Sequence, residues 1–268
     1  MRTLVNLLGC ISLLAATSAV AGPISINLNT PDSRDGIFSS TYAMQYNYNE
    51  GDLNLSVTGW SYGKTSTQTC TKYNKWGQCT AYKTTTSVKQ AIEQDYVGKW
   101  DGLGVEKTDS PNHAVDNEGG DFDMHLLSFD QMVIVDSLDM GWISNDSDVT
   151  VLAYTGTNFD SASLLGKKWQ DLLGMGWALV GNYYNVDYHP NSGKINAGKV
   201  VAQHWLVGAY NDVFGGFTGD NLNKTGGNDY YKLKGVTLEK PPVVEVPEPG
   251  TLLLLALGLL GLGARRRC

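Results

Sequence analysis

The chain has few cysteines and few basic side chains for its 268 residues. Outside its two ends it holds two cysteines, which is too few for a thiolate metal site. It contains no His-Glu-x-x-His pattern and no Gly-x-x-x-x-Gly-Lys phosphate loop followed by Ser or Thr. Its four histidines are isolated from one another in the sequence. These absences argue against a zinc protease or a phosphate-loop nucleotidase and favour a protein that is not an enzyme.

Positive charge is scarce between the two ends. Residues 22–245 hold 16 basic and 26 acidic side chains, a net charge of about −10. A polyanion is repelled by such a chain, so we expect neither nucleic acid nor anionic lipid as a partner. Divalent cations and neutral glycans remain compatible with this charge.

The first 21 residues are typical of a secretory signal peptide. Arg2 supplies the positive start, an apolar core follows, and Ala19-Val20-Ala21 is a small-residue cleavage site. We therefore predict that residues 1–21 are removed on export and that the mature chain begins near Gly22.

The C-terminus combines three features in a fixed order. A Pro-rich linker at 241–246 leads to Pro247-Glu248-Pro249, and the prolines keep this segment extended. Residues 251–264 are uncharged and would form a helix of roughly 21 Å, shorter than the hydrocarbon core of a bilayer. The chain closes on three arginines, which favour the cytoplasmic side as a membrane stop: Arg265, Arg266 and Arg267.

This order resembles the PEP-CTERM sorting signal of bacterial surface proteins, here spanning 247–268. The resemblance implies recognition by an exosortase and cleavage near Pro247-Glu248-Pro249. It also implies a precursor tethered transiently in the inner membrane, and then release to the cell surface or exterior. An ordinary C-terminal membrane anchor is the alternative.

The body, residues 22–240, is predicted to be mainly β. Alternating Tyr-, Trp-, Val- and Thr-rich segments are separated by Gly and Asn/Asp clusters. The expected strands are 41–48, 53–60, 124–135, 149–154, 177–188, 200–210 and 230–238. Such spacing favours an antiparallel β-sandwich resembling a jelly roll. Only 163–173 has helical spacing, through Leu165, Trp169 and Leu172.

Cys70 and Cys79 lie nine positions apart between threonine-rich segments. In an oxidising exterior this spacing predicts a disulfide that closes a hairpin. Trp76 then lies at the hairpin tip, where it is the best candidate for contact with a ligand.

The segment from Trp100 to Asp123 is rich in carboxylates and, with residues up to 155, resembles a domain that recurs in exosortase-dependent surface proteins. Its carboxylates and Asn117 are hard oxygen ligands of the kind that Ca²⁺ prefers. Turn formation is the alternative role for these side chains. The candidate Ca²⁺ ligands are Asp109, Asp116, Asn117, Asp121 and Asp123.

Together these features predict an exported surface or extracellular-matrix protein with a non-enzymatic structural or adhesive role. Its predicted partners are an exosortase, the membrane during sorting, and an exopolysaccharide. The alternative is a carbohydrate-binding module with Ca²⁺ as a candidate cofactor; the sequence establishes no cofactor. Nothing in the sequence names a ligand.

Overall fold

The computed structural model describes residues 22–105, 113–188, 193–217 and 228–242. The predicted signal peptide and the apolar C-terminal segment lie outside these ranges. Thirteen strands are present in the described part: β1 (Ile24–Asn27), β2 (Ser33–Ile37), β3 (Tyr42–Glu50), β4 (Leu53–Tyr73), β5 (Cys79–Asp95), β6 (Val97–Lys99), β7 (Leu103–Val105), β8 (Val115–Asp116), β9 (Met124–Ser144), β10 (Val149–Tyr154), β11 (Trp177–Tyr183), β12 (Ala202–Ala209) and β13 (Tyr230–Glu239).

All strand pairs are antiparallel, and strands make up 58% of the described residues against 8% for helical turns. The prediction of a mainly β, antiparallel body is therefore confirmed. The strands form one continuous sheet, in which β9 joins two parts. Its first residues pair with β4 and β12, and residues from 134 onward pair with β13. The pairings β13–β7–β6–β3–β4–β9–β13 form a closed ring.

The alternation of side chains along the strands buries both faces of the central sheet. Leu127, Trp205 and Val151 belong to one large core. Their neighbours Leu126 and Leu206, which are paired in register, belong to a second core on the opposite face. Side chains of successive strand residues point to opposite faces, so a two-residue run such as Leu126-Leu127 serves both cores.

Short 3-10 helices cover the second core: η2 (Ser161–Leu164), η3 (Trp169–Met175) and η4 (Asp212–Phe214), while η1 (Glu118–Gly120) lies in a loop. Trp169 and Leu172 are buried there, as the helical spacing predicted. The expected inward position of Leu165 is wrong: it is exposed, and Leu164 is buried instead. The reason is that the segment forms two 3-10 helices with an extended link between them, not one α-helical turn pattern.

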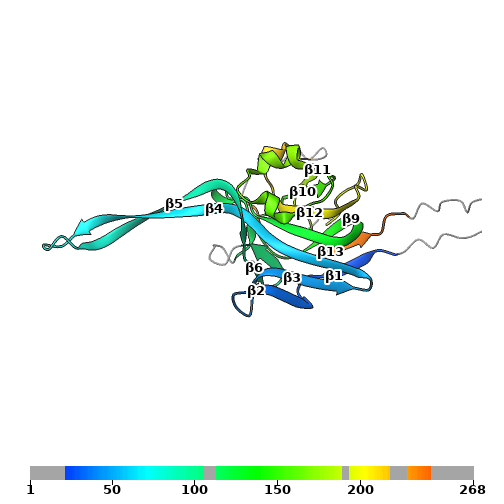
Figure 1. The fold of residues 1–268 in the computed structure, drawn as a ribbon, viewed down its shortest axis with the longest axis horizontal. Helices are drawn as coiled ribbons and strands as arrows, with labels where there is room; N and C mark the ends of the chain where they lie inside the picture. The colour runs from blue at the N-terminus through cyan, green and yellow to red at the C-terminus, as the bar shows by residue number, and fades with distance from the viewer. Residues whose placement is uncertain (1–21, 106–112, 189–192, 218–227, 243–268) are drawn as a thin grey trace, which may run out of the picture.

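The most unusual element is a long hairpin formed by the outer parts of β4 and β5, residues 64–92, which we call the arm. It projects far from the body, and the first and last described residues emerge at the opposite end of the molecule (Figure 1). β1 and β13 pair there through Ile24 and Leu238. The sequence predicted a strand only to Trp60, whereas β4 continues to Tyr73.

Body contacts fix the root of the arm. Tyr62 stacks on Trp169, with ring centroids 5.8 Å apart, and its hydroxyl accepts the Trp169 backbone N–H at 3.0 Å. The Ile92 backbone exchanges hydrogen bonds with Gly166 and Lys167 at 2.8 Å each. Beyond the root no residue from Thr65 to Ser87 is buried. An isolated two-stranded ribbon is marginally stable in water, so the outer arm needs its own cross-link.

That cross-link is the predicted disulfide, which joins Cys70 and Cys79 with their Cα atoms 5.8 Å apart. We predict that the double substitution Cys70→Ser and Cys79→Ser leaves the body intact and loosens only the arm, because the outer arm has no buried contacts with the body. Limited trypsin digestion should then cut faster at Lys72, Lys75 and Lys83, while the thermal midpoint of the body moves by only about 2 °C or less.

The control is the wild-type protein digested after reduction, which should show the same cleavage sites. A fall in the thermal midpoint of several degrees, as expected when a disulfide contributes about 2–4 kcal/mol to global stability, would mean that arm and body unfold together.

Candidate functional site

The acidic segment that the sequence singled out does not converge on one point. Asp116 accepts the Glu118 backbone N–H through its carboxylate at 2.9 Å, and its own N–H is donated to Asp123 at 3.2 Å. Asp121 forms an ion pair of 2.6 Å with Lys64 at the root of the arm. Asp109 lies outside the described residues. The side chains thus shape the loop and hold the arm root, so Ca²⁺ binding by this set stays an untested prediction.

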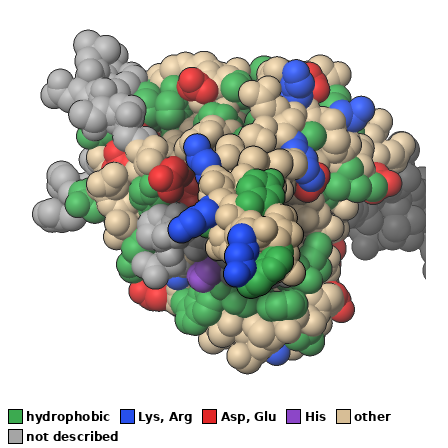
Figure 2. Space-filling model, turned by 90° about the vertical axis from the view of Figure 1, so that its left-hand side faces the viewer, with side chains coloured by type: hydrophobic (Ala, Val, Ile, Leu, Met, Phe, Trp, Pro, Cys, Tyr) green, Lys and Arg blue, Asp and Glu red, His purple; other side chains and the backbone are tan. Residues whose placement is uncertain are grey.

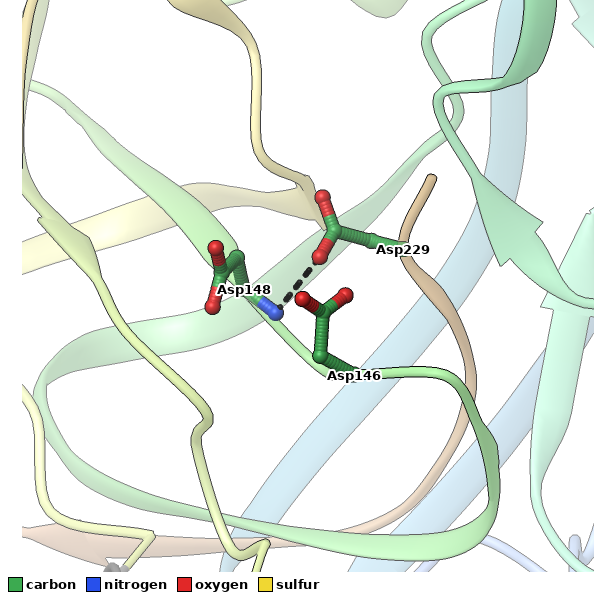
Figure 3. A group of neighbouring side chains, drawn as sticks. All are labelled: Asp146, Asp148 and Asp229. Atoms are coloured by element: carbon green, nitrogen blue, oxygen red, sulfur yellow. Dashed lines mark hydrogen bonds between the residues drawn. The ribbon is translucent and has the colours of Figure 1, made fainter. Parts of the chain in front are cut away.

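Asn117 is the exception, because it reaches a different cluster. Its side-chain amide donates to Asp229 at 2.6 Å, and its side-chain oxygen accepts the Asp229 backbone N–H at 2.9 Å. Asp229 lies beside Asp146 and Asp148 (Figure 3). Among the described residues, these three carboxylates form the one potential metal-binding group, in which one oxygen atom from each lies within 4.8 Å of the other two.

Sequence separation hid this cluster. Asp146 and Asp148 occupy the turn between β9 and β10, and Asp229 precedes β13, more than 80 positions later. The pairing of Tyr230 with Ser144 brings the two segments together. In the sequence both segments are Asn/Asp-rich turns next to a predicted strand. This is the only feature from which their meeting could have been predicted. The register that joins those strands could not be predicted.

The cluster is buried and electrostatically strained. Asp229 is 1% exposed, and its carboxylate accepts the Asp148 backbone N–H at 3.0 Å. Burial, its hydrogen bond to Asp146 and the charges of Asp148 and Asp146 together raise the pKa of Asp229 to about 10. At neutral pH Asp229 therefore keeps its proton. A divalent cation would balance the same negative charge with the same oxygen atoms.

Two enzyme-like sequence patterns have the wrong structural setting. Residues 59–63 spell Gly-Trp-Ser-Tyr-Gly, but Ser61 is buried in the middle of β4. A nucleophile elbow requires a sharp turn between a strand and a helix. Residues 193–199 spell Gly-x-x-x-x-Gly-Lys, but Val200 follows where a phosphate loop has Ser or Thr. Neither pattern forms a catalytic site in this fold.

The arm separates positive charge from the acidic body. Residues 64–92 carry five lysines and no acidic side chain. Lys64 and Lys89 are paired with Asp121 and Glu93 at the root. The other three lie toward the tip, and Figure 2, which looks at the molecule from the arm side, shows lysine side chains at the front and most acidic ones nearer the margins.

The tip has the exposure that the sequence predicted for it. Trp76 is 73% exposed, and the Lys75 ammonium lies 4.4 Å from the centroid of its ring. Asn74 builds the turn: its side-chain oxygen accepts the backbone N–H groups of Trp76 and Gln78 at 2.9 and 3.0 Å. Tyr73 and Tyr82 are also exposed. An ordered turn therefore presents aromatic faces and ammonium groups to solvent.

Comparison with known proteins gives one match. Residues 245–267 match the model of the PEP-CTERM protein-sorting motif. The chain carries a PEP-CTERM sorting signal at its C-terminus. This confirms the resemblance of the tail and supports sorting by an exosortase as a surface protein. The match does not extend to residues 100–155, whose resemblance stays a prediction.

The rest of the chain has no such counterpart: no curated protein and no solved structure matches it. In the part of the chain that the structure describes, no helix is long and apolar enough to cross a membrane. The last described residues lie at the end of the body opposite the arm (Figure 1), and the PEP-CTERM motif follows them in the sequence.

The carboxylate cluster predicts a pH-dependent stability. A raised pKa in the folded state contributes stability that is complete below the unfolded value of 3.8 and is lost as pH rises toward about 10. We expect the thermal midpoint of the wild type to fall between pH 5 and pH 9. Asp146→Asn should reduce this fall, because an amide donates a hydrogen bond to ionised Asp229 and removes one negative charge.

Glu50→Gln is the matched control: it also removes one negative charge, but at an exposed site away from the cluster, and it should keep the wild-type pH dependence. Thermal melts of all three proteins across the pH range test the prediction. Identical slopes for Asp146→Asn and the wild type would show that the cluster does not hold the proton.

Proposed function

We propose that the protein is an exported component of the cell surface or extracellular matrix that an exosortase processes at its PEP motif, with an adhesive and non-enzymatic role for its arm. The observation that carries this proposal is that the arm and the end of the described chain lie on opposite sides of the body. The chain leaves the body toward the sorting signal beside β1, and the arm points the other way. The described chain therefore ends on the side of the body away from the tip.

The length of the arm supports the same role. Ten residues of β4, from Lys64 to Tyr73, span roughly 30 Å in an extended strand. This is several times the Debye length of about 8 Å at physiological salt. The tip lysines therefore act on a partner without cancellation by the acidic body. The tip therefore presents both positive charge and aromatic rings to a partner at a distance from the body.

Sorting is tested by the prolines of the motif. We expect Pro247→Ala with Pro249→Ala to leave an unprocessed precursor in the membrane of a host that carries an exosortase, because alanine frees the backbone that proline keeps extended. Immunoblots of membrane and medium fractions measure the processing.

The matched control is Pro241→Ala with Pro242→Ala, two prolines that precede the motif and should leave maturation unchanged. Equal maturation of the motif variant and the wild type would refute exosortase recognition of this element.

The alternative function is a carbohydrate-binding module whose contact is Trp76. The exposed indole with Lys75 beside it favours this reading, since a flat ring can stack on the apolar face of a sugar. A Ca²⁺ requirement would be an additional property of this module, and the Asp146–Asp148–Asp229 group is a better placed set of ligands than Asp109–Asp123.

We expect Trp76→Ala to weaken retention on the native extracellular polysaccharide by about tenfold, which corresponds to a loss of about 1.4 kcal/mol. Affinity electrophoresis in gels that contain the polymer measures this change. Phe38→Ala removes another exposed aromatic ring, on the body, and is the control. If both variants migrate as the wild type does, the tip does not bind the glycan.

A further inference from the structure

A pocket of about 390 Å³ lies on the body, built from parts of the chain that are far apart in sequence. Its lining comes from the β6–β7 loop, the segment before β8, and strands β9 and β13: Trp100, Asp101, His113, Trp142 and Lys232. Pockets of this size with aromatic walls and a few polar groups are typical of small-ligand sites. None of the functions considered above uses it.

Close backbone approaches hold the walls in place. A Cβ atom on Gly141 would overlap the Asp101 carbonyl oxygen, and one on Gly104 would overlap that of His113. The Trp142 backbone N–H donates to the Asp101 carbonyl at 3.2 Å. Only glycine allows these contacts, so the two loops are fixed against the strands before any ligand arrives.

The aromatic wall is also fixed. The Trp100 ring stacks on His113 with centroids 5.3 Å apart and planes at 25°, and Tyr42 meets both rings edge-on at 5.0 and 5.4 Å. Trp100 stays partly exposed. One indole wall is therefore presented to the pocket in a single orientation.

Lys232 is the unusual polar group of the pocket. The residue is 5% exposed, and its ammonium lies 5.2 Å from the Trp100 ring centroid and 5.6 Å from that of Trp142. Of the described carboxylates, none lies within 4.0 Å of this ammonium. The exposed carboxylate of Asp101 instead reaches Lys234 at 4.0 Å. Burial lowers the pKa of Lys232, and Asp101 partly offsets this.

A largely buried lysine with no described carboxylate in ion-pair range of its ammonium is poorly compensated, and a bound anion at the pocket would pair with that charge. We propose that the pocket binds one sugar unit that carries a carboxylate, a uronic acid residue of an extracellular polysaccharide. The carboxylate accepts a hydrogen bond from the Lys232 ammonium, and the apolar face of the sugar ring stacks on an indole. This inference rests on the carbohydrate-binding alternative proposed above and adds the class of sugar and a second contact site.

Other ligand classes fit the lining less well. A neutral sugar would use the indoles but leave the ammonium unpaired. A simple fatty acid has no flat ring to place between indole faces. A phosphate group is held best by several donors or an arginine fork, and the described lining offers one ammonium. A ring with a single carboxylate uses both the aromatic walls and the lysine.

The test uses the full-length exported protein and short oligomers of galacturonate, glucuronate and mannuronate, each compared with its methyl ester. Titration calorimetry and quenching of tryptophan fluorescence measure the dissociation constants. We expect at least one acidic oligomer to bind, and its methyl ester to bind roughly tenfold more weakly, because esterification removes the charge that pairs with Lys232.

Lys232→Gln should reduce binding of the acid to the level of the ester and leave binding of the ester unchanged. Trp142→Phe should weaken both. Lys167→Gln, an exposed change of the same charge, is the control and should behave as the wild type does. Thermal melts establish that each variant is folded, and Lys232→Met provides a second neutral variant if Lys232→Gln unfolds.

Equal binding of acid and ester, undiminished binding by folded Lys232 variants, or no binding of any of the three acids would overturn the inference. Retention on the native polysaccharide separates this failure from that of the wider proposal. If Trp76→Ala abolishes retention and Lys232→Gln does not, the arm binds the glycan and the pocket inference fails alone. If the wild type is not retained at all, carbohydrate binding fails as well.

Discussion

Strand β9 is the constraint on which the rest of the molecule depends. It pairs with β4 and β12 over its first residues and with β13 over its last, so it links the two parts of the sheet. Its side chains alternate between two buried cores, and each fully buried leucine contributes about 1.5–3 kcal/mol. His125 lies near the start of this strand, fully buried, with its pKa lowered by burial to about 4, so it is neutral at physiological pH. The strand therefore imposes no unpaired charge on either core.

The pairing partners of β9 carry the features that face solvent. β4 pairs with the first part of β9 and then continues into the arm. The second core holds the root of the arm through Tyr62 and Ile92. β13 pairs with the last part of β9 and places Lys232 in the Trp-lined pocket. The turn after β9 brings Asp146 toward Asp229. Arm, pocket and carboxylate cluster thus share one scaffold and keep fixed positions, because none of them depends on a loop alone.

Local sequence features predicted the elements but not their assembly. Alternation located 149–154 within the bounds of β10, and cysteine spacing identified the arm tip with its disulfide and Trp76. Each of those signals lies within about ten residues. The length of the arm was missed because Thr, Ser and Gln alternate without the hydrophobic contrast that marks a half-buried strand. The pocket residues Trp100 and Trp142 were within the segment that the sequence singled out, but Lys232 comes from a strand 90 positions later, and only register places it there.

The distribution of charge gives the two ends of the molecule different chemistry. The acidic body repels anionic surfaces, so a polyanion can approach it only where positive charge is presented separately. The arm presents lysines roughly 30 Å from the body, beyond the range of screened repulsion. The pocket presents one ammonium inside an aromatic enclosure, where low polarity strengthens its attraction for a carboxylate. A polymer with repeated acidic units could meet both at once, and linked contacts bind more tightly than either alone only if their spacing matches the polymer. A rigid arm fixes that spacing, whereas a flexible one would leave it undefined, which is a physical reason for the disulfide at the tip of a ribbon that has no core of its own.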